Sequence, residues 1–458
     1  MMRLGVKVRK WESAKVGEAL VLVSVFAFLI SPTAFAANEA CDSAGLPVMC
    51  REIGIQDAVS VALANHPSVA ARRAMAAAAA ARTRMARSSN RLQLSTSTFA
   101  TAGNMPMILA APEGVMPQSI KIVPDDRGVI QSFMAMYPLY TGGRLSGRIH
   151  GAEALQSAAS AEARMAELDA ALAAKIAFHN VLLAGAFVEA YQTRVDESKE
   201  RLRIAEIAFN EGKIAKYDLL RNRTDLSEAE QMLVESGKDR QMAMIDLNDA
   251  LGVSQSSEIT LQQAQTANGV ERDPDKAREL ALSRRPEMTA ARERIRLAQA
   301  SVDVAKSAFR PQVYATAMQD LGTTRHDGSD AGYIVGITAA LPIFDGGERR
   351  SAVAESRAML EQAQAEQKQA ALMVSRDVAA AIAELDAALK TEELAKAAVS
   401  QAEEDYRVVK MRYEAGKSIN VEVLDALAAY IRAKTALAQA VTNSAIAVER
   451  LKRAEGCM

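Results

Sequence analysis

Glu422 and Asp425 are the residues whose types and spacing best suit a functional site. Residues three positions apart in a helix lie on the same face, so both carboxylates would point the same way. Their chemistry would be electrostatic, because grouped carboxylates attract cations and repel anions. The alternative is that both are solvated acids near a helix start, where the helix dipole stabilises negative charge. The residues alone favour this second interpretation.

The sequence does not place residues in the spacing of a catalytic set or a metal site. The four histidines are scattered without the spacing of metal ligands. The tripeptide Gly416-Lys417-Ser418 resembles the end of a phosphate-binding loop, but position 411 is Met instead of Gly and the segment lies between expected helices. We find no Gly-x-Ser-x-Gly elbow and no nucleophile–base set. We therefore predict a protein that is not an enzyme and binds no metal or cofactor. The net charge of −1 gives no indication of nucleic-acid binding.

Glycine-containing turns recur at a fixed distance along the chain. Each half contains a Gly-Gly turn, formed by Gly142 and Gly143 in the first half and by Gly346 and Gly347 in the second. Each half also contains a later glycine, Gly212 or Gly416, and the two pairs of turns have the same separation of 204 positions. Equal separations mean that the segments between the turns have equal lengths. The chain is therefore predicted to be a tandem duplication of one large unit.

Two windows without proline, 139–273 and 343–458, predict long continuous helices. They are rich in residues that lose little conformational freedom in a helix, and apolar residues recur every three or four positions, as in a coiled coil. The expected helical hairpins cover about 144–251 and 348–453, with a rod of about 100 Å in the second. Further helices are expected over 57–91 and 274–309. Pro67 and Pro286, which are 219 positions apart, should each start a new segment.

Each half also contains a candidate β-hairpin, at about 92–140 and about 312–344. In the second, Tyr333, Val335 and Ile337 share one face, while small or polar residues share the other. This alternation is typical of a strand between lipid and a wet lumen, although a buried strand of a soluble domain would also show it. Four strands cannot close a membrane barrel, which needs about eight, and open sheet edges are excluded from lipid. Several copies must therefore pool their hairpins, and three copies would supply twelve strands.

The first 36 residues have the pattern of a signal peptide. Basic residues precede the 11-residue apolar run Leu20–Ile30, and Ala34-Phe35-Ala36 offers a cleavage site. A transmembrane helix needs about 20 residues, so this run is too short to be one. The chain is therefore divided into a signal peptide (1–36), a first repeat (37–273) and a second repeat (274–458). Cys41 and Cys50 are close enough in sequence to form a disulfide in an oxidising compartment.

This arrangement resembles the TolC-like outer-membrane efflux proteins over nearly the whole mature chain. The resemblance rests on the two halves and on five segments, 138–144, 342–348, 209–213, 413–417 and 422–426. It implies a mainly α fold with a small β part, in which a homotrimer forms a twelve-stranded outer-membrane β-barrel and a long periplasmic α-barrel. It also implies docking onto a periplasmic adaptor and an inner-membrane transporter. One departure is that the first hairpin lacks the proline that Pro311 supplies in the second, which leaves the register of the first hairpin open.

The resemblance assigns roles to residues at the tips of the helical hairpins. Gly212 and Gly416 would mark the periplasmic turns, because glycine accepts the left-handed backbone that ends a helix. Glu422 and Asp425 would point into the periplasmic mouth, where threefold symmetry would turn them into a ring of six acids that favours cations. The resemblance thus reverses the preference that the residues alone give.

Three further residues, Tyr217, Asp218 and Tyr413, lie where members of the family make interhelical hydrogen bonds that hold the tips closed. Ser418 stands where the best-known member has an arginine, so a strong charged latch is not expected here. Tyr413 could equally be a core aromatic residue, and Asp218 an ordinary surface charge. The structure must decide which of these surroundings each side chain has.

The predicted function is an outer-membrane channel that passes substrates from a periplasmic pump assembly to the exterior, for efflux or type I secretion. The main alternative is a periplasmic coiled-coil adaptor or structural rod without a membrane barrel. A rod would share the export signal and the long helices with a channel. It would not need two alternating hairpins, and this difference favours the channel.

Overall fold

The computed structural model describes residues 45–102, 107–109, 120–122, 127–262, 273–324, 328–415 and 417–457. Residues 49–458 form one compact unit, and the fold given below is that of this unit. The predicted signal peptide and Cys41 lie outside the described residues, and Cys50 is exposed at the start of the first strand. The signal peptide and the Cys41–Cys50 disulfide therefore stay predictions.

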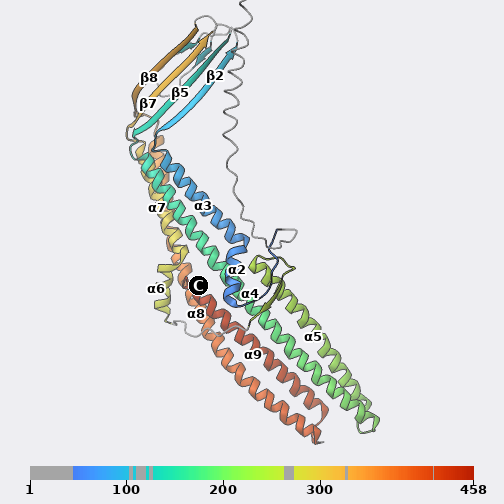
Figure 1. Cartoon of the computed structure of the whole chain (residues 1–458). Helices are drawn as coiled ribbons and strands as arrows, with labels where there is room; N and C mark the ends of the chain where they lie inside the picture. The colour runs from blue at the N-terminus through green and yellow to red at the C-terminus, as the bar shows by residue number, and fades with distance from the viewer. Residues whose placement is uncertain are drawn as a thin grey trace, which may run out of the picture. The chain divides into compact units, whose positions relative to one another are not determined.

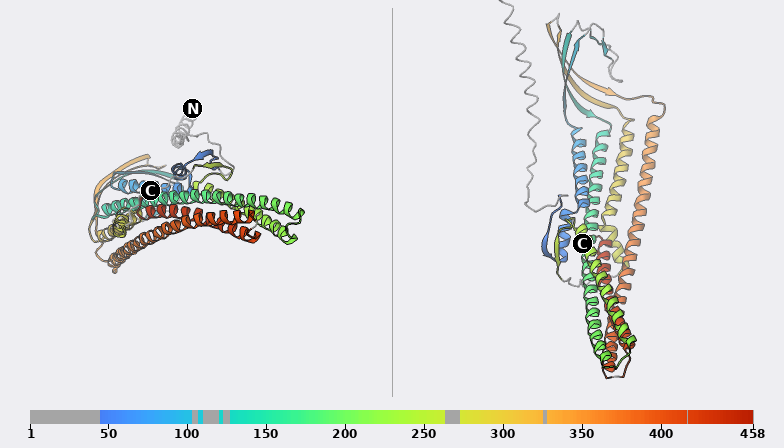
Figure 2. Two further views of the ribbon diagram at one scale, coloured as in Figure 1. Left: turned by 90° about the horizontal axis from the view of Figure 1, so that it is seen from below. Right: turned by 90° about the vertical axis from the view of Figure 1, so that its right-hand side faces the viewer.

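Four long helices form two helical hairpins. The first consists of α4 (Arg144–Asn210) and α5 (Lys216–Leu251), and the second of α8 (Glu348–Glu414) and α9 (Asn420–Ala454). The two hairpins lie side by side, and all four helices extend in the same direction (Figures 1 and 2). Both α4 and α8 contain 67 residues, which corresponds to about 100 Å of helix. Helix α4 includes a window apolar enough to cross a membrane, but α3, α5, α7 and α9 pack against this helix.

In the described part of the chain, the shorter helices come in two pairs, one in each half. The first pair is α2 (Ile55–Asn65) and α3 (Pro67–Ser88), and the second is α6 (Pro274–Arg284) and α7 (Pro286–Ser307). The residues His66 and Arg285 are extended, with ψ of 124° and 130°. A following proline disfavours the α conformation, so the helix must stop there and begin again at the proline. The new segments predicted at Pro67 and Pro286 are therefore present.

The main sheet has four antiparallel strands at one end of the helices (Figure 2). They are β2 (Gln93–Ala102), β5 (Arg127–Tyr140), β7 (Gln312–Thr324) and β8 (Gly328–Ala340), in the order β2-β5-β7-β8. The two hairpins of the chain thus join through the β5–β7 pair. A separate short pair is formed by β3 (Met107–Leu109) and β4 (Ile120–Ile122). Within the described residues, β2 and β8 each have one unpaired edge.

A two-stranded parallel sheet interrupts the helical window predicted over 139–273. Strand β1 (Cys50–Ile53) pairs with β6 (Glu258–Leu261). Helix α5 ends before this strand because Gly252 adopts a left-handed conformation, with φ of 67°. The expectation of continuous helix to residue 273 is therefore wrong for the described residues 252–262. The alternating segment Glu258–Leu261 was the local signal for a strand.

The hydrophobic core consists of equivalent clusters in the two halves. In the first half, Ala174, Phe178 and Leu247 are buried beside β1, β6 and α2. In the second half, Val378, Ile382 and Leu451 occupy the positions 204 residues later and are buried against α6. The helices before the hairpins follow the other separation, since Ala58 and Ala277 are 219 positions apart and both lie in these clusters. Residues 204 positions apart in the hairpins, and 219 positions apart in the helices before them, therefore occupy equivalent places in the structure.

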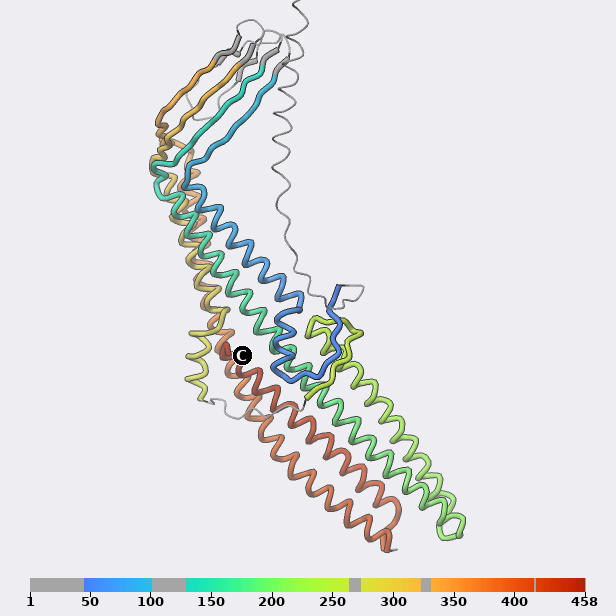
Figure 3. The backbone as a smooth tube through the Cα atoms, in the orientation of Figure 1, coloured from blue at the N-terminus to red at the C-terminus, as the bar shows by residue number. Residues whose placement is uncertain are grey.

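The Gly-Gly turns connect the sheet to the long helices. Gly142 and Gly346 have φ of 62° and 63°, and Gly143 and Gly347 have φ of 95° and 100°. These left-handed values disfavour residues with a Cβ atom. The polypeptide thus makes the same turn twice where a strand becomes a helix (Figure 3). The surroundings of the two turns differ, because a Cβ atom on Gly142 would meet Arg310 and Ser307, whereas one on Gly346 would meet nothing within 4 Å among the described residues.

Candidate functional site

The tips of the two helical hairpins have the same backbone geometry. In the first, Gly212 has φ of 73°, and the Lys213 amide donates to the Ala208 carbonyl at 2.8 Å. In the second, the Lys417 amide donates to the Arg412 carbonyl at the same distance. Gly416 itself lies outside the described residues. The matching hydrogen bonds in the two hairpins indicate that α4 and α8 end in the same way.

Glu422 and Asp425 lie near the start of α9 with both side chains exposed. The residues between and after them, Val423, Leu424 and Ala426, are buried, so the two acids occupy the solvent face of the helix. The Ser418 hydroxyl donates a hydrogen bond to the Glu422 carboxylate. This contact orients Glu422 in the first turn, where the helix dipole favours negative charge. A gate role for the pair stays a prediction.

The three residues of the predicted tip network have different surroundings. Tyr217 is 65% exposed, and its hydroxyl accepts a hydrogen bond from Arg221 of the same helix at 3.1 Å. Tyr413 is half-buried against the aromatic cluster at the tip. Burial raises the pKa of Tyr413, and the negative charge of nearby Asp218 raises that pKa further. The structure thus brings Asp218 and Tyr413 near each other, but no hydrogen bond joins them within the described residues.

The hydrogen bonds that join the two hairpins involve residues that the sequence did not single out. The Tyr406 hydroxyl on α8 donates to Glu197 Oε2 on α4 at 2.7 Å. Lys410 Nζ donates to the same oxygen at 3.1 Å. Burial alone would raise the pKa of Glu197, but the hydrogen bonds from Tyr406 and Lys410 outweigh it and lower that pKa. We call Glu197, Tyr406 and Lys410 the tip bridge.

Aromatic packing fixes the orientation of Tyr406 within the tip bridge. Its ring stacks on Tyr430 of α9, with centroids 6.1 Å apart and an interplanar angle of 4°. Burial raises the pKa of Tyr406, and the hydrogen bond to Glu197 raises it further. The hydroxyl therefore stays protonated and can act as a hydrogen-bond donor. Tyr406 and Tyr413 are seven positions apart, and this helical spacing was the only sequence signal for the bridge.

Asp225 holds α4 and α5 together near the same tip. It accepts hydrogen bonds from Ser198 at 2.6 Å, from Arg194 at 3.3 Å and from Arg201 at 3.5 Å. Arg201 is buried, and its Nε and Nη1 atoms have no hydrogen-bond partner within the described residues. The first hairpin is thus clamped internally, whereas the tip bridge joins it to the second.

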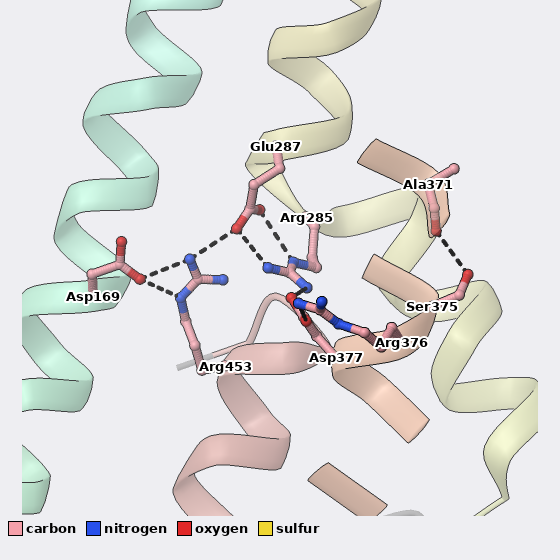
Figure 4. Close-up of polar contacts among 8 residues, drawn as sticks. All are labelled: Asp169, Arg285, Glu287, Ala371, Ser375, Arg376, Asp377 and Arg453. Carbon is pink, nitrogen blue, oxygen red and sulfur yellow. Dashed lines mark hydrogen bonds and ion pairs between the residues drawn. The ribbon is translucent and has the colours of Figure 1, made fainter. Parts of the chain in front are cut away.

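A second cluster of charges joins four helices where α9 ends, partway along α4 and α8 (Figure 4). Arg453 of α9 donates to Asp169 of α4 at 2.8 Å and to Glu287 of α7 at 2.9 Å. Arg285, just before α7, donates to Glu287 at 2.7 Å and to Asp377 of α8 at 3.2 Å. We call these five residues the junction cluster.

The charges of the junction cluster are strongly coupled. Burial alone would raise the pKa of Glu287, but the hydrogen bond from Arg285 and the charge and hydrogen bond of Arg453 lower it to about 2. A buried ion pair lies close to the junction cluster and also joins α4 to α9. In this pair, Lys175 Nζ is 2.6 Å from Glu449 Oε2. The second hairpin is therefore attached to α4 by ionic contacts near the C-terminal end of α9 as well as by the tip bridge.

None of these clusters has the composition of a metal site. Within the described residues, no group of three or more His, Cys, Asp or Glu side chains could hold a metal ion. The charged groups instead lie between helices and pair with opposite charges. Their chemistry is the attachment of long helices to one another.

The sequence profile of the outer membrane efflux protein family matches residues 58–253 and 277–456, one segment in each repeat. The chain belongs to this family. Membership confirms the predicted outer-membrane localisation and the predicted resemblance to TolC-like efflux proteins. The two matched segments contain the equivalent core clusters, in agreement with the duplicated architecture.

A relative and several solved structures agree with this family. Outer membrane protein OprJ of Pseudomonas aeruginosa is 30% identical over 181 residues, which cover 38% of this chain and 37% of OprJ. A membrane protein from Pseudomonas aeruginosa has a TM-score of 0.74 at 21% identity, with 88% of this chain and 92% of that chain covered. The outer membrane channel CmeC of Campylobacter jejuni has a TM-score of 0.73 at 17% identity, with 88% and 85% covered. These structures confirm the predicted fold class of long helices with a small β part.

Proposed function

We propose that three copies of this chain form the outer-membrane conduit of a tripartite efflux pump or of a type I secretion system. In this proposal, the sheets combine into one β-barrel and the helical hairpins form a tube that extends into the periplasm. A periplasmic adaptor and an inner-membrane transporter would deliver the substrate to its lower end. The similar structure of CmeC, which is named as an outer membrane channel, supports this assignment.

The open four-stranded sheet is the observation that carries the proposal. Its edge strand β8 exposes Tyr333, Val335 and Ile337, which share one face. An apolar face together with unpaired backbone groups at the edge is stable in lipid only when other strands complete the sheet. A soluble rod has no use for such a sheet. The architecture therefore favours a channel over the alternative of a periplasmic adaptor or rod.

The exposed acids Glu422 and Asp425 fit the entrance of this conduit. They lie at the end of the helices farthest from the sheet, on the solvent face of α9. Three copies would place six carboxylates around one axis and favour the entry of cations. The tip bridge lies in the same region and would help to keep that entrance narrow.

Cell-envelope fractionation and bilayer recordings test the function. The full-length protein should sediment with outer-membrane vesicles, require detergent for extraction and run in detergent at three times the mass of one chain. Reconstituted into planar bilayers, it should conduct ions. A monomer that is soluble without detergent, with no conductance, would support the rod and refute the channel.

A further inference from the structure

The four-stranded sheet carries a group of methionines on the face opposite its apolar residues. Val335 of β8 lies on the apolar face, so the adjacent Ile334 lies on the other, because successive side chains of a strand alternate between faces. Met318 of β7 is directly opposite Ile334, and Met134 of β5 is directly opposite Met318. Met136 lies two residues after Met134 and shares its face. We call Met134, Met136 and Met318 the methionine group, and in the proposed channel this face lines the lumen.

The pairing of β5 with β7 brings the three thioether side chains within reach of one ion. Directly opposite residues on neighbouring strands have Cβ atoms about 4.5–5.5 Å apart, so Met134 and Met318 are immediate neighbours. Met136 is opposite Thr316 and is the diagonal neighbour of Met318, at about 7–8 Å. Each methionine side chain has three rotatable bonds, so the three sulphur atoms can turn toward a common point.

The surroundings of the methionine group are mostly small or polar. The register of the first hairpin, which the sequence left open, places Ser95 opposite Met134 and Gln93 opposite Met136. Met134 is 44% exposed and Met318 is 36% exposed. The burial of apolar surface in a core therefore does not account for three methionines at these positions.

A carboxylate lies on the same face beside the methionine group. Asp320 is two positions from Met318 in β7, so the two side chains share a face. The Oδ1 atom of Asp320 is buried and has no hydrogen-bond partner within the described residues. A buried acceptor without a donor indicates that a water molecule or an ion completes its surroundings. The lumen face thus combines soft sulphur ligands with a negative charge that attracts cations.

The sequence of the first hairpin is rich in methionine. A Met-x-Met motif occurs twice there, at Met105–Met107 and at Met134–Met136. Of the 20 methionines in the chain, five lie between positions 105 and 136, where an even distribution would place one or two. In a strand, the Met-x-Met spacing directs both thioethers to one face. This local excess favours a role for the sulphur atoms themselves.

We propose that the methionine group binds a soft monovalent metal cation, Cu(I) or Ag(I), as cargo that passes through the lumen. This inference rests on the proposed channel and names a substrate class for it. Thioether sulphur is a soft ligand that selects Cu(I), whereas Mg²⁺ and Ca²⁺ prefer oxygen ligands. The prediction that the chain binds no metal rested on the spacing of histidines, and a thioether site does not need that spacing.

The exposure of the methionine group suits a site that a cation enters and leaves. Conduction requires binding that is favourable enough for entry and weak enough for release. Neutral thioethers carry no charge of their own, so the attraction from Asp320 is the main electrostatic contribution beside them. An apolar cargo is the alternative, because methionine also adapts to apolar molecules. The serine, glutamine and aspartate around the group favour the cation.

Silver binding by the full-length protein in detergent tests this site. Thiols also bind silver, so every protein in the comparison carries Cys41→Ser, Cys50→Ser and Cys457→Ser, and this parent is titrated with silver nitrate in chloride-free buffer by calorimetry. The lumen triple variant replaces each member of the methionine group by leucine, a change that nearly conserves volume and keeps the fold. The parent should bind one more silver ion per chain than the lumen triple variant.

A matched control replaces three exposed methionines that lie on helices. Met85→Leu, Met359→Leu and Met373→Leu together form the helix triple variant, and these side chains are 67%, 50% and 47% exposed. This variant should bind as much silver as the parent. In planar bilayers with a nitrate electrolyte, silver should lower the potassium conductance of the parent and of the helix triple variant, because a bound cation repels those that follow. The conductance of the lumen triple variant should not respond to silver.

The inference is overturned if the lumen triple variant binds as much silver as the parent, or if the helix triple variant loses binding equally. Loss of binding of an apolar dye from the lumen triple variant, with its silver binding intact, would show an apolar lining and would also overturn it. A parent protein that is a monomer without detergent and does not conduct refutes the proposed function instead. A conducting trimer without the silver site refutes this inference alone.

Discussion

The tip bridge gives a direct prediction about the closed state of the channel. Tyr406→Phe removes one hydroxyl and keeps the ring that stacks on Tyr430. A hydrogen bond to a charged group contributes about 1.5–3 kcal/mol. Glu197 keeps its contact with Lys410 and is partly exposed, so we expect the lower end, about 1.5 kcal/mol. This energy corresponds to a shift of roughly tenfold in the equilibrium between joined and separated tips, since about 1.4 kcal/mol is one factor of ten.

Single-channel recording in planar bilayers measures this shift. If the bridge is made only in the closed state, Tyr406→Phe should raise the open probability or the mean conductance by roughly the same tenfold factor. The matched control is Tyr430→Phe, which removes a hydroxyl that makes no hydrogen bond within the described residues. It should leave the recordings unchanged.

The energetic argument is refuted if Tyr406→Phe and Tyr430→Phe behave alike. A double-mutant comparison with Glu197→Ala, which removes the acceptor, separates the bridge from general loosening of the tip. If Tyr406 acts through Glu197, then Tyr406→Phe should have little further effect in the Glu197→Ala background. Additive effects of the two substitutions would show that they act independently.

Three further predictions concern the other charged groups. Asp425→Asn should lower both conductance and cation selectivity in bilayers, and unchanged values would reject a gate role for the acidic pair. Glu287→Gln should be less stable than wild type in urea unfolding at pH 7. Because the pKa of Glu287 is lowered to about 2 in the folded protein, the contribution of its charge to the free energy of unfolding is complete above about pH 4.5. This contribution is lost as the pH falls toward 2. The difference from wild type should therefore shrink by about 2 kcal/mol at pH 3, and a constant difference would contradict this. Lys175→Met leaves the buried Glu449 carboxylate with Lys452 as its remaining partner and should lower the free energy of unfolding by about 3–5 kcal/mol. The double variant Lys175→Met with Glu449→Leu should recover most of this loss in the same assay.

The positions of glycine and proline made most of the fold predictable. The equal spacing of Gly142–Gly212 and Gly346–Gly416 fixed the two long helices at one length, and α4 and α8 both contain 67 residues. Pro67 and Pro286 marked helix starts because the residue before proline avoids the α conformation. These signals act within a few residues, so a single sequence is sufficient to detect them. The β1–β6 pair escaped because its strands are short and lie about 200 positions apart.

The bridging residues could not be found in the same way. Tyr406 and Glu197 are 209 positions apart, and Arg453 and Glu287 are 166 positions apart. A glutamate on a helix surface looks the same in the sequence whether it pairs across helices or faces water. The duplication did not help either, because Arg453 corresponds to Asp249 and Asp377 corresponds to Ala173. The junction cluster thus has no counterpart at the equivalent positions of the other repeat, and internal symmetry cannot predict it.

This asymmetry bears on how the tube could open. The second hairpin is attached to its neighbours at two levels, and the two attachments differ in strength. At the junction cluster, two arginines bind three carboxylates on four helices, and the pKa of Glu287 is strongly lowered. At the tip, one partly exposed carboxylate accepts both contacts.

We hypothesise that opening separates the tips first while the junction cluster serves as a pivot. Local openings begin where the fewest interactions must break. Hydrogen exchange should therefore be faster at the amides of 400–414 than at those of 445–454, although both segments are helical. Equal protection at the two levels would show that the hairpin moves as a unit and would reject the pivot.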